Sequence, residues 1–410
     1  MLNNPQTRSL SGAEPAPGIA AQILGWAAYL ACSWTWCIGM FLPVLLIRDL
    51  GWSGFVAFAL PNIVGAAIFG VTLARRGSSE QFVASHRTLV WLFSVVTVCF
   101  QAFFLGSLLR PLPLGPEQGA ILLGATGFAL LVHFTTDRTA VIRLVSIGTW
   151  IVSAALMVFA ARGGHAGPPP ALALAPPDKS SLAGLGMVCA LGFSFCPYLD
   201  RTFHEARRKL PGVPGTIAFI FGFCVLFAAM ISFTVLYARE GTLTAVPLGG
   251  ATEIPLSVAL DSLVLAHIAV QLGFTIGAHA KWAVAEAPAG GADSPAARAR
   301  LWVLGPVLVG LLASMFVAGV RGVHGLGGFE TAYRAFLAFY GLVFPAYVWL
   351  CATPLGASPP PTRRSLVVWV CAMIAASPFY WLGFMQREYA WLLLGVGIIA
   401  SAKLLLIGHR

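Results

Sequence analysis

The polar residues best suited to chemistry follow one another along a single apolar stretch of this chain. His267, Gln271, Thr275 and His279 recur every four residues, and Asp261 lies shortly before them. At about 100° per residue, this spacing gives a polar stripe that winds slowly around a helix. If the stretch crosses a membrane, each of these groups is costly unless it faces protein or water. The stripe therefore indicates either a polar cavity or hydrogen bonds between packed helices.

Two coupling chemistries fit this stripe, and the residues leave both open. A histidine exchanges its proton near neutral pH, and His267 is the preferred proton carrier because His279 lies close to Lys281 and to the expected inner surface. A sodium ion would instead need a cluster of oxygens, which Thr275 and freed backbone carbonyls near Cys37 could supply. Two histidines so far apart in sequence do not match a metal-ligand spacing, so we expect no bound metal.

Two other apolar stretches are each interrupted by helix-breaking residues, at 36–43 and at 192–200. We expect helical geometry to be lost near 37–40 and 193–197. A helix broken at membrane depth leaves free N–H and C=O groups that need a partner or a polar cavity. Two breaks at corresponding positions in two halves of a chain are typical of the substrate site of a secondary transporter. The alternative is that glycine and proline merely kink two packed helices.

The groups beside the breaks are the candidate site residues. The candidate substrate ligands lie in the two broken stretches, with Gln101 added from the third apolar stretch and Gln271 from the eighth. They are Cys37, Gly39, Met40, Phe193, Ser194, Cys196, Tyr198, Gln101 and Gln271. The candidate ion- or proton-coupling residues are His267, Thr275, Asp261 and Asp200. Asp200 follows the second break, where a carboxylate would cap the next half-helix. That capping role competes with binding a cationic substrate or a proton.

Composition identifies the class of protein that positions these groups. The chain is 58% hydrophobic and only 10% charged, which a soluble domain of 410 residues does not show. Each apolar stretch is long enough to cross a bilayer. We expect twelve transmembrane helices, at roughly 20–47, 54–74, 86–109, 117–135, 139–161, 181–203, 215–238, 256–284, 299–320, 330–353, 365–385 and 389–407.

The charge distribution sets the expected orientation. With the N-terminus in the cytoplasm, about two thirds of the 25 Lys and Arg residues fall on the cytoplasmic side, as the positive-inside rule requires. The distribution of the basic residues thus accounts for the net charge of +10 as that of a protein in the lipid bilayer, and we expect no nucleic-acid partner. Residues 1–19 are expected to form a disordered cytoplasmic arm instead of a cleaved signal peptide. We expect a multi-pass protein of the inner (cytoplasmic) membrane with both termini cytoplasmic.

The second break and the helix after it resemble the sixth-helix signature of the amino acid–polyamine–organocation (APC) superfamily of transporters. Residues 193–197 fall on its aromatic-rich break, Glu205 on its second acidic position and Pro214 on its late proline. The first broken stretch resembles the superfamily's GSGIFxxPG pattern through Gly39, Phe41 and Pro43.

This resemblance implies a leucine-transporter (LeuT) type fold with a 5+5 inverted repeat and discontinuous helices one and six. The ten-helix core would cover 20–353, with repeats of about 20–161 and 181–353, and two peripheral helices would occupy 354–410. Sites in this fold lie where helices one and six unwind, walled by helices three, eight and ten. Twelve spans also suit a major-facilitator transporter, but the short link between spans six and seven disfavours that fold.

The expected function is a secondary active transporter that moves a small organic solute, such as an amino acid or an amine, by alternating access coupled to H⁺ or Na⁺. The first alternative is a non-transporting membrane sensor or scaffold that keeps the fold. A weaker alternative is a membrane enzyme with His267 and Asp261 as acid and base. Since the sequence contains no GxSxG, no GxxxxGK[ST] and no paired carboxylates in a plausible cavity, we expect neither an enzyme nor a cofactor.

Overall fold

The structure is a computed structural model that describes residues 18–75, 77–108, 115–163, 178–238, 261–287, 294–318, 322–352 and 358–407. Every regular element within these ranges is helical. Most of the expected N-terminal arm, residues 1–17, lies outside the described residues, as do large parts of the two longest expected outer loops.

The helices follow one another as α1 (Ile19–Trp34), α2 (Cys37–Thr72), α3 (Ser78–Ser85), α4 (Arg87–Leu108), α5 (Pro116–Thr135), α6 (Thr139–Arg162), α7 (Lys179–Phe195), the 3-10 turn η1 (Cys196–Leu199), α8 (Arg201–Lys209), α9 (Gly212–Phe221), the π-helix η2 (Gly222–Phe227), α10 (Ala228–Ser232), α11 (Thr234–Tyr237), α14 (Ser262–Ala285), α15 (Pro295–Ala299), the π-helix η3 (Arg300–Leu304), α16 (Gly305–Ala318), α17 (Gly328–Cys351), α18 (Arg363–Met385), the 3-10 turn η4 (Tyr389–Trp391), α19 (Leu392–Ala402) and α20 (Leu404–Ile407).

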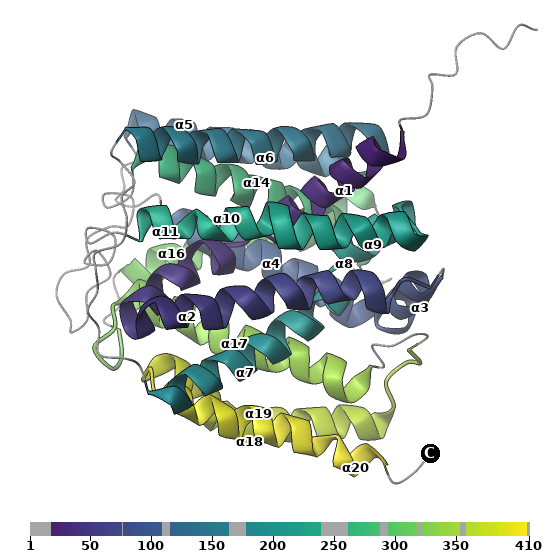
Figure 1. Cartoon of the computed structure of the whole chain (residues 1–410), viewed down its shortest axis with the longest axis vertical. Coiled ribbons are helices and arrows are strands. Elements are labelled where there is room, and N and C mark those ends of the chain that lie inside the picture. The colour runs from purple at the N-terminus through teal and green to yellow at the C-terminus, as the bar shows by residue number, and fades with distance from the viewer. Residues whose placement is uncertain are drawn as a thin grey trace, which may run out of the picture.

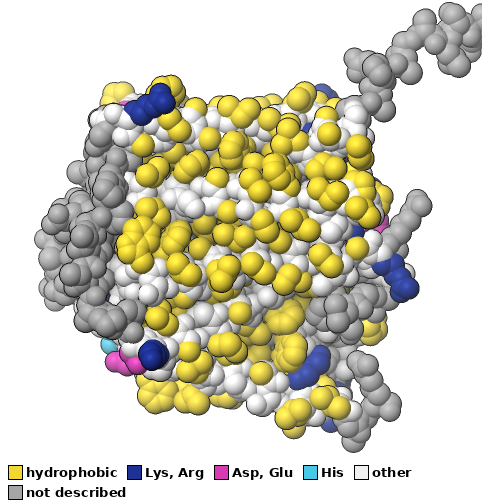
Figure 2. Space-filling view, viewed as in Figure 1, with side chains coloured by type: hydrophobic (Ala, Val, Ile, Leu, Met, Phe, Trp, Pro, Cys, Tyr) yellow, Lys and Arg dark blue, Asp and Glu magenta, His cyan; other side chains and the backbone are white. Residues whose placement is uncertain are grey.

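The described helices form one bundle with a membrane-like surface. Ten helical stretches are long and apolar enough to cross a bilayer, and two shorter apolar helices, Ile19–Trp34 and Gly119–Thr135, accompany them. The axes of most long helices are roughly aligned in Figure 1, whichever way the chain runs along them. Figure 2 shows hydrophobic side chains over the middle of the visible face, with charged side chains toward its two ends. These features identify a multi-pass membrane protein.

The first helix break lies earlier than the sequence predicted. α1 ends at Trp34, Trp36 is extended (φ −88°, ψ 168°), and the helix resumes at Cys37. The prediction of non-helical backbone at 37–40 is therefore wrong, because these residues form the first turn of α2. The break falls at Thr35 and Trp36 because their side chains satisfy the end of α1: the Thr35 hydroxyl donates to the Ala31 carbonyl (2.7 Å) and the Trp36 indole N–H to the Ser33 carbonyl (2.6 Å).

The second break also begins later than predicted. Helix α7 continues to Phe195, η1 follows, and Asp200 is extended (φ −81°, ψ 109°) before α8 starts at Arg201. Residues 193–195 are thus helical, and the prediction of a break at 193–197 is correct only from Cys196 onward. Pro197 is accommodated at the start of the 3-10 turn, where its missing N–H is not needed.

A glycine bend divides α2 into two parts. Gly51 has φ 64° and ψ −158° inside the 36-residue helix, a conformation that an L side chain rarely adopts. The part before Gly51 is the second half of the first predicted span, and the part after it is the second span. We refer to this end of the bundle as the Gly51 end and to the opposite end, where α3 and α8 lie, as the α3 end (Figure 1).

Packing places α14 at the centre of the bundle. Helix α14 contacts α4, α5, α6 and α1, whereas α18 and α19 pack on α17 and α7. Helix α1 packs on α6, α9 and η2, and α7 packs on both α2 and α17. Helix α4 packs on α16. The two helix breaks and α14 therefore meet in the interior of the bundle.

Candidate functional site

Asp200, which joins η1 to α8, has two carboxylate oxygens in different situations. Its side chain is fully buried. Oδ1 accepts hydrogen bonds from the Thr202 backbone N–H (2.8 Å) and hydroxyl (2.6 Å), so Asp200 is the N-cap that the sequence suggested. Oδ2 has no hydrogen-bond partner among the described residues. Capping therefore uses only half of this carboxylate.

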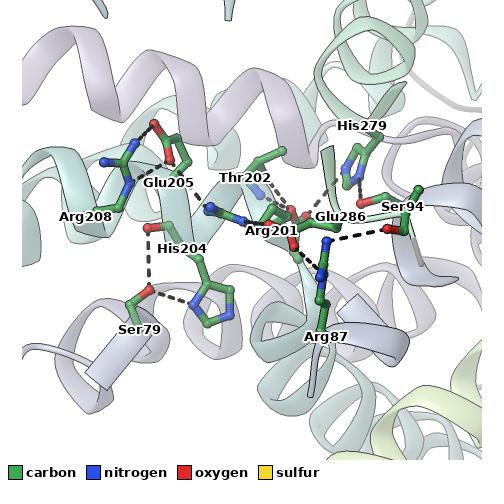
Figure 3. Close-up of polar contacts among 12 residues, drawn as sticks. Ser79, Arg87, Ser94, Arg201, Thr202, His204, Glu205, Arg208, His279 and Glu286 are labelled. Carbon is green, nitrogen blue, oxygen red and sulfur yellow. Dashed lines mark hydrogen bonds and ion pairs between the residues drawn. The ribbon is translucent and has the colours of Figure 1, made fainter. Parts of the chain in front are cut away.

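His279 on α14 faces the remaining oxygen. Its Nε2 lies 3.7 Å from Asp200 Oδ2, and its Nδ1 lies 3.3 Å from the Ser94 hydroxyl on α4. Both side chains are completely buried, and Nε2 has no hydrogen-bond partner within the described part of the chain. Figure 3 shows His279 between Ser94 and the start of α8. The separation is too long for a direct hydrogen bond, but it leaves the two titratable groups close enough for the charge of one to affect the other.

Aromatic rings surround this pair. The Trp36 ring, contributed by the first break, lies 5.4 Å from the His279 ring and 5.6 Å from the Tyr340 ring. Phe93 lies 5.4 Å from Trp36 and 5.6 Å from Tyr340. The Tyr340 hydroxyl is buried without a hydrogen-bond partner among the described residues. The site thus combines one buried carboxylate, one imidazole and an aromatic wall.

A hydroxyl contact joins the two breaks directly. Thr202 Oγ1, at the start of α8, lies 3.1 Å from Ser33 Oγ in the last turn of α1. Ser33 and Thr202 are both completely buried. Side chains from both breaks, α4, α14 and α17 therefore form one polar and aromatic cluster in the bundle interior, which we call the Asp200–His279 site.

The predicted ligands on α2 lie beside this cluster. The Cys37 backbone N–H, freed at the start of α2, donates to Gln101 Oε1 (3.3 Å), while the Cys37 carbonyl accepts from the Tyr333 hydroxyl (3.1 Å). The Met40 carbonyl accepts from the Tyr237 hydroxyl (2.5 Å). Gly39 is buried, and a Cβ built on it would meet only the Phe227 ring, at 3.8 Å. Gln101 and Cys37, both singled out from sequence, are thus brought together.

The stripe on α14 divides into parts with different partners. Gln271 Nε2 donates to Ser153 Oγ (2.7 Å), and Thr275 Oγ1 donates to the Cys32 carbonyl (3.4 Å). Asp261 caps α14 by accepting from the Leu263 N–H (2.9 Å). His267 has no hydrogen-bond partner among the described residues, and its ring meets Phe233 edge-on at 5.9 Å. Only the last member, His279, reaches the second break.

The remaining predicted ligands lie along the second broken segment. The Phe193 ring meets Phe58 edge-on at 5.2 Å, and the backbone of Phe193 and Ser194 packs closely on Gly65 of α2. Cys196 is buried in η1. The Tyr198 hydroxyl donates to Thr72 Oγ1 (2.6 Å). Phe193, Ser194 and Tyr198 contact α2 in these interactions, whereas Asp200 faces the interior pair.

Sequence reasoning did not select three members of the site: His279 as the partner of Asp200, Trp36, and Ser94. His279 was visible as the last member of the polar stripe. The sequence gives no signal for Ser94, which is one of several small polar residues in its segment. Trp36 opens the interrupted stretch at 36–43 but was not among the candidate ligands.

A pocket of about 300 Å³ opens at the α3 end, close to this site. Glu286 at the end of α14 accepts from Arg87 Nε (3.2 Å) and from Arg201 Nε (3.1 Å). Arg201 directly follows Asp200, and its guanidinium lies over the Trp282 ring at 4.1 Å. Glu286 therefore ties α14 to the starts of α4 and α8, as Figure 3 shows.

Helix α8 is fixed on its other side by a buried histidine. His204 Nδ1 lies 2.7 Å from Ser79 Oγ on α3, and its Nε2 lies 2.8 Å from the Tyr198 carbonyl. Burial lowers the pKa of His204 to about 3, so the ring is neutral. The hydrogen bond to Glu205 raises the pKa of Arg208, so the Arg208 guanidinium stays charged.

A buried ion network closes the Gly51 end. Arg334 Nε donates to Glu330 Oε1 (2.6 Å), Arg48 Nη2 donates to the same oxygen (2.6 Å), and Arg334 also pairs with Asp49. The Tyr389 hydroxyl donates to Asp49 Oδ2 (2.8 Å). Two arginines and two carboxylates balance one another, and the network joins α2, α17 and η4.

No group of three or more His, Cys, Asp or Glu side chains in the described part of the chain is arranged to hold a metal ion. No protein-family model and no curated protein matches this chain.

Proposed function

We propose that this protein is a secondary active transporter for a small organic solute, with its solute and coupling site at Asp200 and His279. The observation that carries the proposal is the buried carboxylate oxygen at the second helix break, which faces a buried imidazole and lacks a hydrogen-bond partner among the described residues. Burying such groups is costly, and a transport cycle that brings a cation or proton to them explains why they are present.

The packing pairs support the 5+5 inverted repeat that the APC resemblance implies. Numbering the spans one to twelve, span four (α5) packs on span eight (α14), and span nine (α16) packs on span three (α4). Span one (α1) packs on span seven (α9 and η2) and on span five (α6), while span six (α7) packs on span two (α2) and on span ten (α17). Exchanging spans one to five with spans six to ten converts each of these pairs into another, as a pseudo-two-fold axis requires.

The two ends of the bundle supply the closures that alternating access needs. In the proposed orientation, the α3 end faces the cytoplasm, where Glu286 bridges Arg87 and Arg201. The network around Arg334 closes the outer end. Opening either side requires breaking a small set of ion pairs. The proposed cycle therefore alternates between two arrangements, one open at the α3 end and one open at the Gly51 end.

The geometry favours protons over sodium for coupling. The proposed proton carrier is now the Asp200–His279 pair. His267 lies twelve residues from His279, about 18 Å along the helix. A sodium ion would need several oxygens directed at one point. The Thr275 hydroxyl instead donates a hydrogen bond to the Cys32 carbonyl, so these two oxygens are paired with each other.

Reconstitution tests this proposal. Purified protein is first screened by thermal shift against amino acids, amines and nucleobases, and any stabilising solute is then offered to proteoliposomes that enclose a pH-sensitive dye. We expect a pH gradient to drive accumulation of that solute and the solute to move protons. If no solute stabilises the protein and none moves across wild-type proteoliposomes, the scaffold or sensor alternative replaces transport.

Gly39→Leu should block transport while leaving the protein folded. The space around Gly39 accepts a Cβ without a close contact. Side chains on a helix tilt toward its N-terminus, which for α2 is the first break. We expect solute uptake to fall by about tenfold or more, a loss of roughly 1.4 kcal/mol or more in transition-state stabilisation, with a melting temperature near that of the wild type.

Gly222→Leu is the matched control, since Gly222 is also buried in a helix but lies against α1. A Cβ there would come within 2.9 Å of the Ala27 carbonyl oxygen. This variant should therefore lose stability first. Wild-type uptake by a folded Gly39→Leu protein would show that Gly39 is not near the solute path.

A further inference from the structure

The Asp200 carboxylate has no fixed cation beside it in the described structure. The titratable groups around it are Tyr29 on α1, His279 on α14, Tyr340 on α17 and Cys196 on η1. Arg201 is the nearest arginine in sequence, but its guanidinium is bound by Glu286 and Glu205 and stacks on Trp282. The negative charge is therefore left for a mobile cation to balance.

The walls of the site suit an organic cation. Trp36, Tyr340 and Phe93 form a buried group with ring centroids 5.4–5.6 Å apart. Aromatic faces attract ammonium groups, and the attraction is strongest where water is excluded. A carboxylate beside such rings binds a protonated amine more strongly than a neutral solute of the same shape.

At the first break, the leading N–H of α2 is not free to bind a second, negative group. A free helix N-terminus is the usual site for a substrate carboxylate in such a transporter. Here the Cys37 N–H at the start of α2 already donates to Gln101 Oε1. Ion pairs or hydrogen bonds of Arg or Lys to Asp200, His279 or Ser94 are also absent among the described residues. The site therefore favours an amine without a carboxylate over an amino acid.

We propose, on the basis of the transport function proposed above, that the site binds a small organic amine in exchange for a proton. The Asp200–His279 pair holds one proton, whichever of the two residues carries it. When the ammonium group reaches Asp200 Oδ2, the proton leaves through the same open side. One ammonium ion then crosses in one direction for one proton in the other, so no net charge moves and no covalent bond changes.

Isothermal titration of the purified, full-length protein tests this exchange directly. The probes are methylammonium and benzylammonium, both of which stay protonated between about pH 5.5 and 8. Titration in two buffers of different ionisation enthalpy counts the protons released. We expect about one proton per amine bound at low pH, and a Kd that rises by up to about tenfold per unit fall in pH. Benzyl alcohol, the neutral analogue, and phenylalanine, which adds a carboxylate, should bind much more weakly.

Two variants locate the effect. Asp200→Asn should bind neither amine, and His279→Gln should still bind benzylammonium but with a changed pH dependence and fewer protons released. His279→Gln keeps the test valid if Asp200→Asn does not fold. Amine binding without proton release, or equal binding of phenylalanine and benzylammonium, would overturn the exchange.

The outcomes separate this inference from the transport proposal. If proteoliposomes carry a neutral or zwitterionic solute while neither amine binds nor competes, the amine inference fails and the transporter stands. If nothing is transported and nothing binds, both fail.

Discussion

Replacing Asp200 by asparagine should abolish solute accumulation driven by a pH gradient. Asparagine keeps the shape of the side chain and an oxygen to cap α8 in place of Oδ1, but it carries neither a charge nor an exchangeable acidic proton. We expect the initial rate of gradient-driven uptake into proteoliposomes to fall by about 100-fold or more, equivalent to roughly 2.7 kcal/mol. The helix cap is retained, so the melting temperature should change little.

Asp178→Asn is the matched control for that experiment. Asp178 is also an N-cap aspartate, accepting from the Ser181 N–H at 3.1 Å at the start of α7, but it is exposed. Losing its charge should leave uptake unchanged. An Asp200→Asn protein that accumulates solute at the wild-type rate, with the wild-type pH dependence, would remove Asp200 from the coupling mechanism.

Local sequence signals predicted the Asp200 side of the site well. A carboxylate that follows a broken segment and precedes a helix is a recognisable N-cap, and the structure confirms the cap. The membrane class was equally accessible, because apolar stretches of about 20 residues in a chain with few charges are typical of transmembrane helices. Both signals depend only on residues close together in the chain.

The partner of Asp200 could not be predicted in the same way. His267 and His279 lie on the same apolar segment at the same periodicity, and only the packing of α14 against the second break distinguishes them. Because His279 lies only two residues before Lys281, the sequence indicated a position near the inner surface. The structure instead places its ring in the interior with no exposed surface. Distance along a chain is a poor guide to depth where helices are tilted and broken.

The position of the first break shows a similar limit. Gly39 and Pro43 are strong helix-breaking signals, yet both lie inside α2. The interruption instead lies at Thr35 and Trp36, whose own side chains satisfy the last carbonyls of α1, while Gln101 on α4 satisfies the first free N–H of α2. A break occurs where its free backbone groups find partners, and one of those partners comes from a distant segment.

Replacing Arg334 by methionine should have the largest effect on stability. Arg334 is fully buried, contacts Glu330, Asp49 and Tyr389, and balances the charge of a closed network. Methionine fills similar space but leaves one buried negative charge without compensation. Removing one partner from a buried ion network costs about 3–5 kcal/mol, so the purified variant should melt well below the wild type or fail to accumulate.

Arg208→Met controls for the loss of an arginine as such. Arg208 also pairs with a glutamate, Glu205, at 2.6 Å, but 42% of the Arg208 side chain is exposed. Arg201 (3.5 Å) and Lys209 (4.0 Å) still face Glu205 when Arg208 is removed, so we expect a cost of about 1 kcal/mol or less. The melting temperature of Arg208→Met should stay close to that of the wild type.

Restoring charge balance offers a second check. Adding Glu330→Gln to Arg334→Met removes the excess negative charge and should recover part of the lost stability. Equal melting of the wild type and both arginine variants would mean that the network contributes little to stability. The closure of the Gly51 end would then have to be sought in the apolar contacts between α2 and α17, such as that of Phe41 with Phe329.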